Sequence, residues 1–271
     1  MGRILLAAPL FFILAACGSS SPPEEGALSG PGLYIALGDS LSEGVGASDR
    51  DTTAFVPLVR EGLWEGFEFM NLGHSGDTSS DLLDHGHLEQ AAAEVSERNS
   101  DDDPNNDVKL VTLEMGGNDL LRHYLSRPLT IDCPPVQRSL DRPQCVDILQ
   151  ETLDEFGQNL GTALDRLREA DAGLAIAVMT FYNPVPRRFG PIGTEGISQM
   201  AEVALEGQAN GPLPEGLNDI IRRETEKRGF ILVDLYPLFE GKANQFIARD
   251  FIHPNDVGHE VIAEAVLSAV R

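Results

Sequence analysis

A serine, an aspartate and a histidine in this chain have the side chains needed for nucleophilic catalysis. Ser40 stands in residues 38–42, Gly-Asp-Ser-Leu-Ser, directly after the apolar run 33–37. Asp250 and His253 occur together much later, in residues 250–254, Asp-Phe-Ile-His-Pro. A serine hydroxyl becomes a good nucleophile when an imidazole takes its proton, and a carboxylate that orients the imidazole improves that base. The sequence therefore holds all three parts of such a centre.

Short apolar runs alternate along the chain with longer segments of helical periodicity. We expect strands at residues 33–37, 67–72, 108–113, 174–180 and 230–235, and helices at 53–64, 80–98, 146–170, 256–270 and, with an interruption, 195–228. Gly229 is a stop signal before the last strand, and Pro254 is a start signal for the last helix. This alternation is typical of βαβ units and predicts an α/β fold with a parallel sheet covered on both faces.

Polar, glycine-containing segments follow three of these predicted strands. They are residues 38–40 (Gly-Asp-Ser), 73–78 (Gly-His-Ser-Gly-Asp-Thr) and 116–119 (Gly-Gly-Asn-Asp), and residues 250–253 come just before the last helix. Ligands bind at the carboxyl ends of the strands in an open α/β sheet. We therefore expect these segments to meet around one cleft.

The same segments form four ordered blocks, which are more specific than a single Gly-Asp-Ser triplet. The blocks are residues 38–42, 71–78 (Asn-Leu-Gly-His-Ser-Gly-Asp-Thr), 116–119 and 250–254. In these blocks the chain resembles the SGNH hydrolases of the GDSL esterase and lipase family, over a span from about residue 33 to 271. The resemblance implies a flavodoxin-like, three-layer α/β/α fold with a central five-stranded parallel sheet.

The resemblance also implies a role for each block. Ser40 is expected to attack an acyl carbonyl, with His253 as general base and then general acid and Asp250 hydrogen-bonded to its other ring nitrogen. The oxyanion would be held by the backbone N–H groups of Ser40 and Gly76 and by the side-chain amide of Asn118.

Other interpretations of these blocks are less well supported. Gly73 is a competing backbone donor, but the Ser-Gly-Asp-Thr run around Gly76 corresponds better to the family pattern. Ser42 stands where the elbow Gly-x-Ser-x-Gly needs glycine, which disfavours the ordinary α/β-hydrolase fold. Asp39 and Asp119 are placed like a glycosidase carboxylate pair, but their positions favour ordering of the nucleophile turn and capping of a helix.

The N-terminal segment has the features of an export signal. Arg3 precedes an apolar stretch that is too short to span a bilayer, so we expect residues 1–16 to be a signal peptide. Residues 14–17, Leu-Ala-Ala-Cys, resemble the processing box of bacterial lipoproteins and make Cys17 the expected site of lipid attachment; an ordinary secreted protein is the alternative. Residues 17–32 predict a flexible tether, and residues 33–271 predict a single hydrolase domain.

The chain is strongly acidic, with 43 acidic against 20 basic residues and a formal net charge of −23. This balance disfavours binding to nucleic acid or to an anionic membrane surface. We therefore expect an exported protein anchored at the cell envelope through acyl chains on Cys17, facing the periplasm or the exterior.

The two remaining cysteines, Cys133 and Cys145, are separated by twelve positions in a proline-rich segment. In an exported chain a disulfide is favoured over free thiols. Neither cysteine has a histidine beside it, so a structural role is expected for both.

The other histidines have structural explanations. His85 and His87 lie in a polar, helix-like stretch and are expected to be solvated, and His123 has no acid at a useful spacing. His74 either lines the cleft or packs as a loop or core residue. His259, on the last predicted helix, is expected to form structural hydrogen bonds.

Three further features bear on metals, the core and specificity. The acidic run 101–107 lacks the glycine and terminal glutamate of an EF-hand loop, so no metal or cofactor is expected. Trp64 is expected in the core. Residues 122–145 and 181–189 are candidate walls of the substrate pocket, with Arg187 and Arg188 as a polar rim.

These observations predict a serine hydrolase that cleaves carboxylic esters with short or medium acyl chains, through an acyl-enzyme on Ser40. The substrate is expected to be a small ester or an acyl lipid, and a lysophospholipid or a thioester remains open. The alternatives are a carbohydrate O-deacetylase of the same fold and a surface lipoprotein that binds ligands without turnover.

Overall fold

The computed structural model describes residues 28–126, 133–134, 136–189 and 192–271. Its centre is a sheet of five parallel strands in the order β2-β1-β3-β4-β7. The strands are β1 (Gly32–Gly38), β2 (Phe67–Gly73), β3 (Val108–Leu113), β4 (Ala175–Met179) and β7 (Ile231–Val233). The predicted α/β class and the five-stranded parallel sheet are confirmed.

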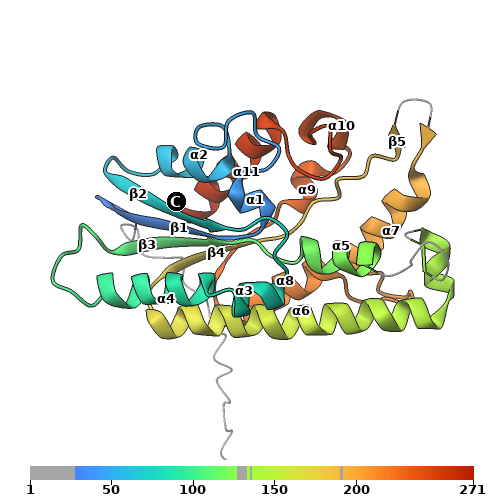
Figure 1. Cartoon of the computed structure of the whole chain (residues 1–271), viewed down its shortest axis with the longest axis horizontal. Coiled ribbons are helices and arrows are strands. Elements are labelled where there is room, and N and C mark those ends of the chain that lie inside the picture. The colour runs from blue at the N-terminus through green and yellow to red at the C-terminus, as the bar shows by residue number, and fades with distance from the viewer. Residues whose placement is uncertain (1–27, 127–132, 135, 190–191) are drawn as a thin grey trace, which may run out of the picture.

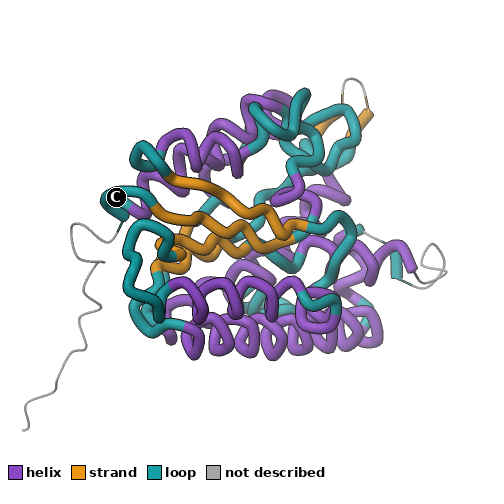
Figure 2. The backbone as a smooth tube through the Cα atoms, turned by 60° about the vertical axis from the view of Figure 1, so that its left-hand side comes forward, coloured by secondary structure: helices purple, strands orange, loops and turns teal. Residues whose placement is uncertain are grey.

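Helices cover both faces of the sheet, as Figures 1 and 2 show. One layer contains α3 (Ser79–Asp84), α4 (His87–Arg98), α6 (Pro143–Ala170) and α8 (Leu217–Arg228), and the other contains α2 (Phe55–Gly62) and α11 (Asp256–Val270). Successive side chains of a strand point to opposite faces. Leu33, Ile35 and Leu37 of β1 accordingly join the core on the α4 and α6 side, whereas Tyr34 and Ala36 join the core under α2 and α11. Burial on both faces explains why the strands are almost wholly apolar.

Further elements gather beyond the carboxyl ends of the strands. They are α1 (Ser40–Glu43), α5 (Gly117–Ser126), the 3₁₀ helix η1 (Gln137–Asp141), the hairpin of β5 (Arg188–Phe189) and β6 (Ile192–Gly193), α7 (Glu195–Glu206), α9 (Tyr236–Phe239) and α10 (Ala243–Phe246). Figure 1 shows α5, α7 and β5 beyond one end of the sheet. A disulfide joins Cys133 to Cys145 at the start of α6.

Strand register brings the polar blocks to one edge. Leu37 of β1 pairs with Leu72 of β2 and with Leu113 of β3, and Leu113 pairs with Val178 of β4. The residues that follow these positions therefore emerge side by side at the carboxyl edge of the sheet. This edge carries the candidate active site.

Two local predictions were wrong. Trp64 is not a core residue but is 64% exposed, because α2 ends at Gly62 and Leu63 has extended backbone angles, which take Trp64 off the buried helix face. The helix expected over residues 80–98 is two helices, because Gly86 has a φ of +86° and interrupts it between α3 and α4. Only glycine adopts that backbone conformation without steric cost.

The predicted signal peptide and Cys17 lie outside the described residues. Contacts with the domain begin within the predicted tether: Leu28 packs against the core under α2, and the carbonyl of Ser29 accepts a hydrogen bond from Lys109 Nζ at 2.8 Å. Among the helices of the described segments, none has the length and hydrophobicity required to cross a bilayer.

Candidate active site

Ser40 is the first residue of α1, immediately after β1. The preceding residue, Asp39, is the N-cap of this helix, and its Oδ1 accepts a hydrogen bond from the backbone N–H of Leu41 at 3.1 Å. The expected ordering of the nucleophile turn by Asp39 is thus seen directly. Ser40 is largely buried, at 9% exposure, so its hydroxyl faces a site from which most solvent is excluded.

Asp250 and His253 lie in a tight turn that precedes α11. Asp250 Oδ1 accepts hydrogen bonds from the backbone N–H groups of Ile252 and His253, both at 3.0 Å. Phe251 has a φ of +64°, the sole positive φ of a non-glycine residue in the described segments, and such a conformation persists only where surrounding contacts hold it. Burial raises the pKa of Asp250, but the hydrogen bonds from Ile252 and His253 outweigh it, and the net pKa is below the ordinary value.

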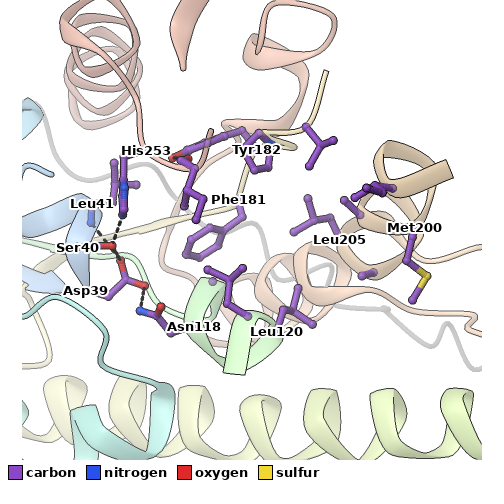
Figure 3. A pocket seen from close by; sticks show the side chains of 18 residues that line it. Asp39, Ser40, Leu41, Asn118, Leu120, Phe181, Tyr182, Met200, Leu205 and His253 are labelled. Atoms are coloured by element: carbon purple, nitrogen blue, oxygen red, sulfur yellow. Dashed lines mark hydrogen bonds between the residues drawn. The ribbon is translucent and has the colours of Figure 1, made fainter. Parts of the chain in front are cut away.

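The three side chains form one hydrogen-bonded relay, and Figure 3 shows its contact between Ser40 and His253. His253 Nε2 lies 2.8 Å from Ser40 Oγ, and His253 Nδ1 lies 2.7 Å from Asp250 Oδ2. A ring nitrogen bonded to a carboxylate carries its proton there, which leaves the other nitrogen free to accept one. The arrangement is therefore competent to remove the proton of Ser40 during attack on an electrophile.

The predicted oxyanion donors come from three segments: Ser40 begins α1, Gly76 lies in the turn after β2, and Asn118 lies near the start of α5. Among the described residues, the backbone N–H groups of Ser40 and Gly76 donate no hydrogen bond to a backbone carbonyl. The N–H of the competing candidate Gly73 is already bonded to Asn71 Oδ1 at 2.9 Å. Gly76 has a φ of +89°, and its backbone is presented from the turn after β2. Backbone N–H groups without an intramolecular acceptor are the kind of donor that an oxyanion hole needs.

Asn118, near the start of α5, joins two of the blocks. Its Nδ2 donates to Asp39 Oδ2 and to the carbonyl of Asp77, both at 2.9 Å. Both amide hydrogens are thus engaged, so donation to a substrate oxyanion would share or replace one of these bonds. The Asn118 side chain fixes the nucleophile turn relative to the turn that carries Gly76.

Glu114 is a buried acid beneath the nucleophile turn that the sequence analysis missed. Its Oε1 accepts hydrogen bonds from the backbone N–H groups of Asp39 at 3.0 Å and Ser42 at 3.1 Å. Burial, reinforced by the charge of Asp39, raises the pKa of Glu114 well above its usual range, which favours the neutral form of this carboxyl. The available signal was an acid at the end of an otherwise apolar strand, directly before the Met-Gly-Gly-Asn segment.

A cavity of about 300 Å³ opens beside Ser40 and His253, a volume at the lower end of the range for small-molecule sites. Its walls come from α5, the segment after β4 and α7, and consist mainly of apolar side chains: Leu120, Leu121, Phe181, Pro184, Val185, Ile197, Met200, Ala201, Ala204 and Leu205. Figure 3 shows Leu120, Phe181, Met200 and Leu205 around this space.

The cavity agrees in part with the predicted pocket walls. The expected segment 181–189 supplies Phe181 and Val185, whereas Arg187 does not line the cavity and lies 3.6 Å from Glu202. The segment 122–145 is only partly described. The sequence did not point to α7, because an amphipathic helix with apolar residues looks the same whether it covers a core or a ligand pocket.

The remaining candidate residues have other positions. His259 is fully buried and bonds to Phe55 and Val45, as expected. Asp119 accepts hydrogen bonds from the backbone N–H and hydroxyl of Ser79, the first residue of α3, whose N-cap is Thr78. The side chain of His123 is outside the described part of the structure. Asp39 and Asp119 do not form a carboxylate pair like that of a glycosidase, because Asp39 lines the cavity whereas Asp119 is bonded to Ser79.

His74 is a loop residue, one of the expected alternatives, and His85 is as exposed as expected, but His74, His85 and His87 share one partner that the sequence did not indicate. All three gather around the buried carboxylate of Asp77, although the side chains of His74 and His85 are 59% and 46% exposed. A hydrogen bond to Asp77 raises the pKa of His74. His74 does not line the cavity. The interruption between α3 and α4 brings His85 and His87 to the same point, which a single continuous helix would not do.

A three-layer α/β/α fold with a Ser-His-Asp relay at the carboxyl edge of its parallel sheet defines a hydrolase of the SGNH type. The family model for the GDSL-like lipases and acylhydrolases matches residues 36–261. The chain therefore belongs to the GDSL-like lipase/acylhydrolase family and is a carboxylic ester hydrolase.

Known proteins similar to this chain agree with the family. The Bacillus subtilis (strain 168) protein YpmR is 24% identical, over 97% of this chain and 94% of that protein. The lipase Lip_vut3 from a goat rumen metagenome has a TM-score of 0.61 at 21% identity, with 88% of this chain and 96% of that chain covered. Phospholipase A1 from Streptomyces albidoflavus NA297 has a TM-score of 0.59 at 20% identity, with 88% and 99% covered. At these identities the structural likeness establishes the fold alone.

Proposed function

We propose that this protein hydrolyses carboxylic esters with short or medium apolar acyl chains, through an acyl-enzyme on Ser40. One observation carries the proposal: the Ser40, His253 and Asp250 relay faces a cavity with mainly apolar walls. A nucleophile with its base accounts for ester cleavage, and the apolar walls account for an acyl chain longer than acetyl.

The mechanism follows from the contacts of the relay. His253 Nε2 takes the proton as Ser40 Oγ attacks the acyl carbonyl, and Asp250 stabilises the resulting imidazolium. The oxyanion is held by the N–H groups of Ser40 and Gly76 and by the Asn118 amide. Collapse expels the alcohol, which receives the proton from His253. A water molecule, deprotonated by the same ring, then attacks the acyl-enzyme and releases the acid and free Ser40.

The apolar walls of the cavity also favour some of the alternative substrates over others. Lysophospholipids and thioesters present the same apolar acyl group to the pocket, so they remain within the proposal, in keeping with the names of the lipase and the phospholipase A1 above. An O-acetylated sugar has no apolar chain to fill the space between α5 and α7, which makes a carbohydrate O-deacetylase less well supported. A binding protein without turnover would need no base opposite a serine.

For localisation, we propose that the protein is exported and lipid-anchored through Cys17. The support is the Leu-Ala-Ala-Cys segment after an apolar stretch, followed by polar residues. Mass spectrometry of the N-terminal peptide from cell envelopes tests this: a diacylated or triacylated Cys17 is expected in the native chain and is lost in Cys17→Ser. An unmodified N-terminus upstream of Cys17 would refute the anchor.

The enzymatic proposal is tested on p-nitrophenyl esters from acetyl to palmitoyl. We expect an optimum at an acyl chain longer than acetyl, and turnover at the uncatalysed rate in Ser40→Ala with an unchanged melting temperature. A fluorophosphonate should label the native chain at Ser40. Turnover in Ser40→Ala equal to that of the native chain would exclude Ser40 as the nucleophile, and an optimum at acetyl would exclude the proposed acyl specificity.

A further inference from the structure

Three histidines converge on one buried carboxylate outside the relay. We call His74, Asp77, His85 and His87 the histidine cluster. Asp77 Oδ1 lies 2.8 Å from His74 Nδ1 and 3.2 Å from His85 Nδ1, and Asp77 Oδ2 lies 3.7 Å from His87 Nδ1. The ring centroids of the three histidines are 5.5 to 6.4 Å apart. One ligand atom from each of His74, Asp77 and His85 can be chosen so that all lie within 4.8 Å of one another.

Three different elements supply the cluster. His74 follows β2, Asp77 immediately precedes the N-cap of α3, His85 ends α3 and His87 begins α4. The left-handed conformation of Gly86 folds the chain between α3 and α4 so that both His85 and His87 face Asp77. The convergence is therefore a product of the turn between the helices.

We propose that the histidine cluster is a binding site for a divalent transition metal ion of the zinc type. Imidazole nitrogens suit zinc, copper and nickel, whereas calcium and magnesium prefer oxygen ligands. Three histidines and one carboxylate supply the four ligands of a tetrahedral zinc site. Without a metal, the single carboxylate of Asp77 cannot form a good hydrogen bond with all three histidine nitrogens. A cation bound between them would be coordinated by all three nitrogens at once.

Small side-chain movements suffice to close the site. Metal bonds of about 2.0 Å in a tetrahedral arrangement place ligand atoms roughly 3.3 Å apart, compared with the 4.8 Å limit seen here. Asp77 is buried, at 3% side-chain exposure, whereas the side chains of His74 and His85 are about half exposed. Their rings therefore have room to open the 2.8 and 3.2 Å contacts to Asp77 slightly around a metal ion. Asp81 Oδ1, 3.6 Å from His85 Nε2, adds negative charge beside the site.

The site adjoins the proposed oxyanion hole. Gly76 lies between His74 and Asp77 in sequence, and the carbonyl of Asp77 accepts the hydrogen bond from Asn118. A metal held by His74 and Asp77 therefore bridges the turn that presents the Gly76 N–H. This consequence, unlike the metal site itself, rests on the function proposed above.

Calorimetry with Zn²⁺ tests the proposal directly. The purified protein, freed of any histidine tag and treated with EDTA, should bind one equivalent of Zn²⁺ and show a higher melting temperature with the metal. Co²⁺ should give the visible absorption of a tetrahedral site. His74→Gln, His85→Gln and His87→Gln should each weaken Zn²⁺ binding by at least roughly 10-fold.

Two controls keep this test separate from catalysis. His253→Gln removes a histidine outside the cluster and should bind Zn²⁺ as the native chain does, and so should Ser40→Ala. Binding that is absent in the native chain, or that is unchanged in all three cluster variants, would overturn the metal site. Because binding is measured without substrate, this result does not depend on whether the esterase proposal holds.

Discussion

The side chain of Glu114 supports the backbone of Asp39 from inside the sheet. Glu114 Oε1 accepts hydrogen bonds from the backbone N–H groups of Asp39 at 3.0 Å and Ser42 at 3.1 Å. Both residues are buried, and burial raises the pKa of each. The raised pKa favours a neutral Glu114, which would hold the turn that carries Ser40 without adding a second charge to the site.

This relationship predicts that one substitution of Glu114 is tolerated and that another destabilises the fold. Glu114→Gln keeps the carbonyl acceptor and the neutral charge, so its melting temperature and kcat should stay close to those of the native chain. Glu114→Ala leaves two buried N–H groups unsatisfied and should cost about 2 to 6 kcal/mol of unfolding free energy, measured by urea denaturation. If Gln were as damaging as Ala, an ionised Glu114 would be required instead.

The turn at Asp250 predicts that asparagine is a worse replacement than alanine. Asp250 Oδ1 accepts two backbone N–H groups, so the oxygen of asparagine would stay there and its NH₂ would face His253 Nδ1. That forces the proton onto His253 Nε2, where it blocks deprotonation of Ser40.

We therefore expect kcat to fall by about 10⁴-fold in Asp250→Asn and by less in Asp250→Ala. Steady-state kinetics on a p-nitrophenyl ester measure both changes, with circular dichroism as the control for folding. Equal activity of Asp250→Asn and the native chain would contradict the tautomer argument.

His259 predicts a loss of stability at mildly acidic pH. Its Nδ1 accepts the Phe55 N–H and its Nε2–H donates to the Val45 carbonyl, and burial lowers its pKa to about 4. The unfolded chain takes up this proton near pH 6.5 and the folded chain only near 4, so stability falls as the pH drops between those values.

Across this pH range the shifted pKa of His259 lowers the free energy of unfolding by about 3 kcal/mol in all. Unfolding free energies measured from pH 7 to 4.5 should therefore decline more steeply in the native chain than in His259→Gln, which has no proton to gain. Parallel curves would show that His259 does not contribute to the acid sensitivity.

The cavity predicts that a larger side chain on α7 shortens the preferred acyl chain. In Ala201→Phe the added ring occupies space beside Met200 and Leu205. We expect kcat/KM for octanoyl esters to fall at least about 10-fold, while that for acetyl esters is retained. Ala93→Phe, at an exposed position of α4, is the matched control and should leave the chain-length profile unchanged. A uniform loss on all esters would argue against an acyl role for this cavity.

The sequence alone was sufficient for the sheet and for the ordered blocks. Burial on both faces requires nearly continuous apolar strands, so the runs at residues 33–37 and 108–113 were visible without a structure. The blocks that follow them contain residues whose chemistry is local, such as Asp39 as the N-cap of α1. The catalytic set of Ser40, Asp250 and His253 was also predicted from these blocks and from the chemistry of the three side chains.

Tertiary structure decided the features that depend on which elements lie next to one another in space. Gly86 turns what reads as one helix into two, and only then do His85 and His87 meet Asp77. Glu114 acquires its role from the backbone of Asp39, the N-cap of α1, which is distant in the sequence. Likewise, α7 becomes a pocket wall only by lying across from α5. Sequence patterns report which face of an element is apolar, because periodicity follows from local geometry. They do not report what that face packs against, since this is set by the packing of segments far apart in the chain.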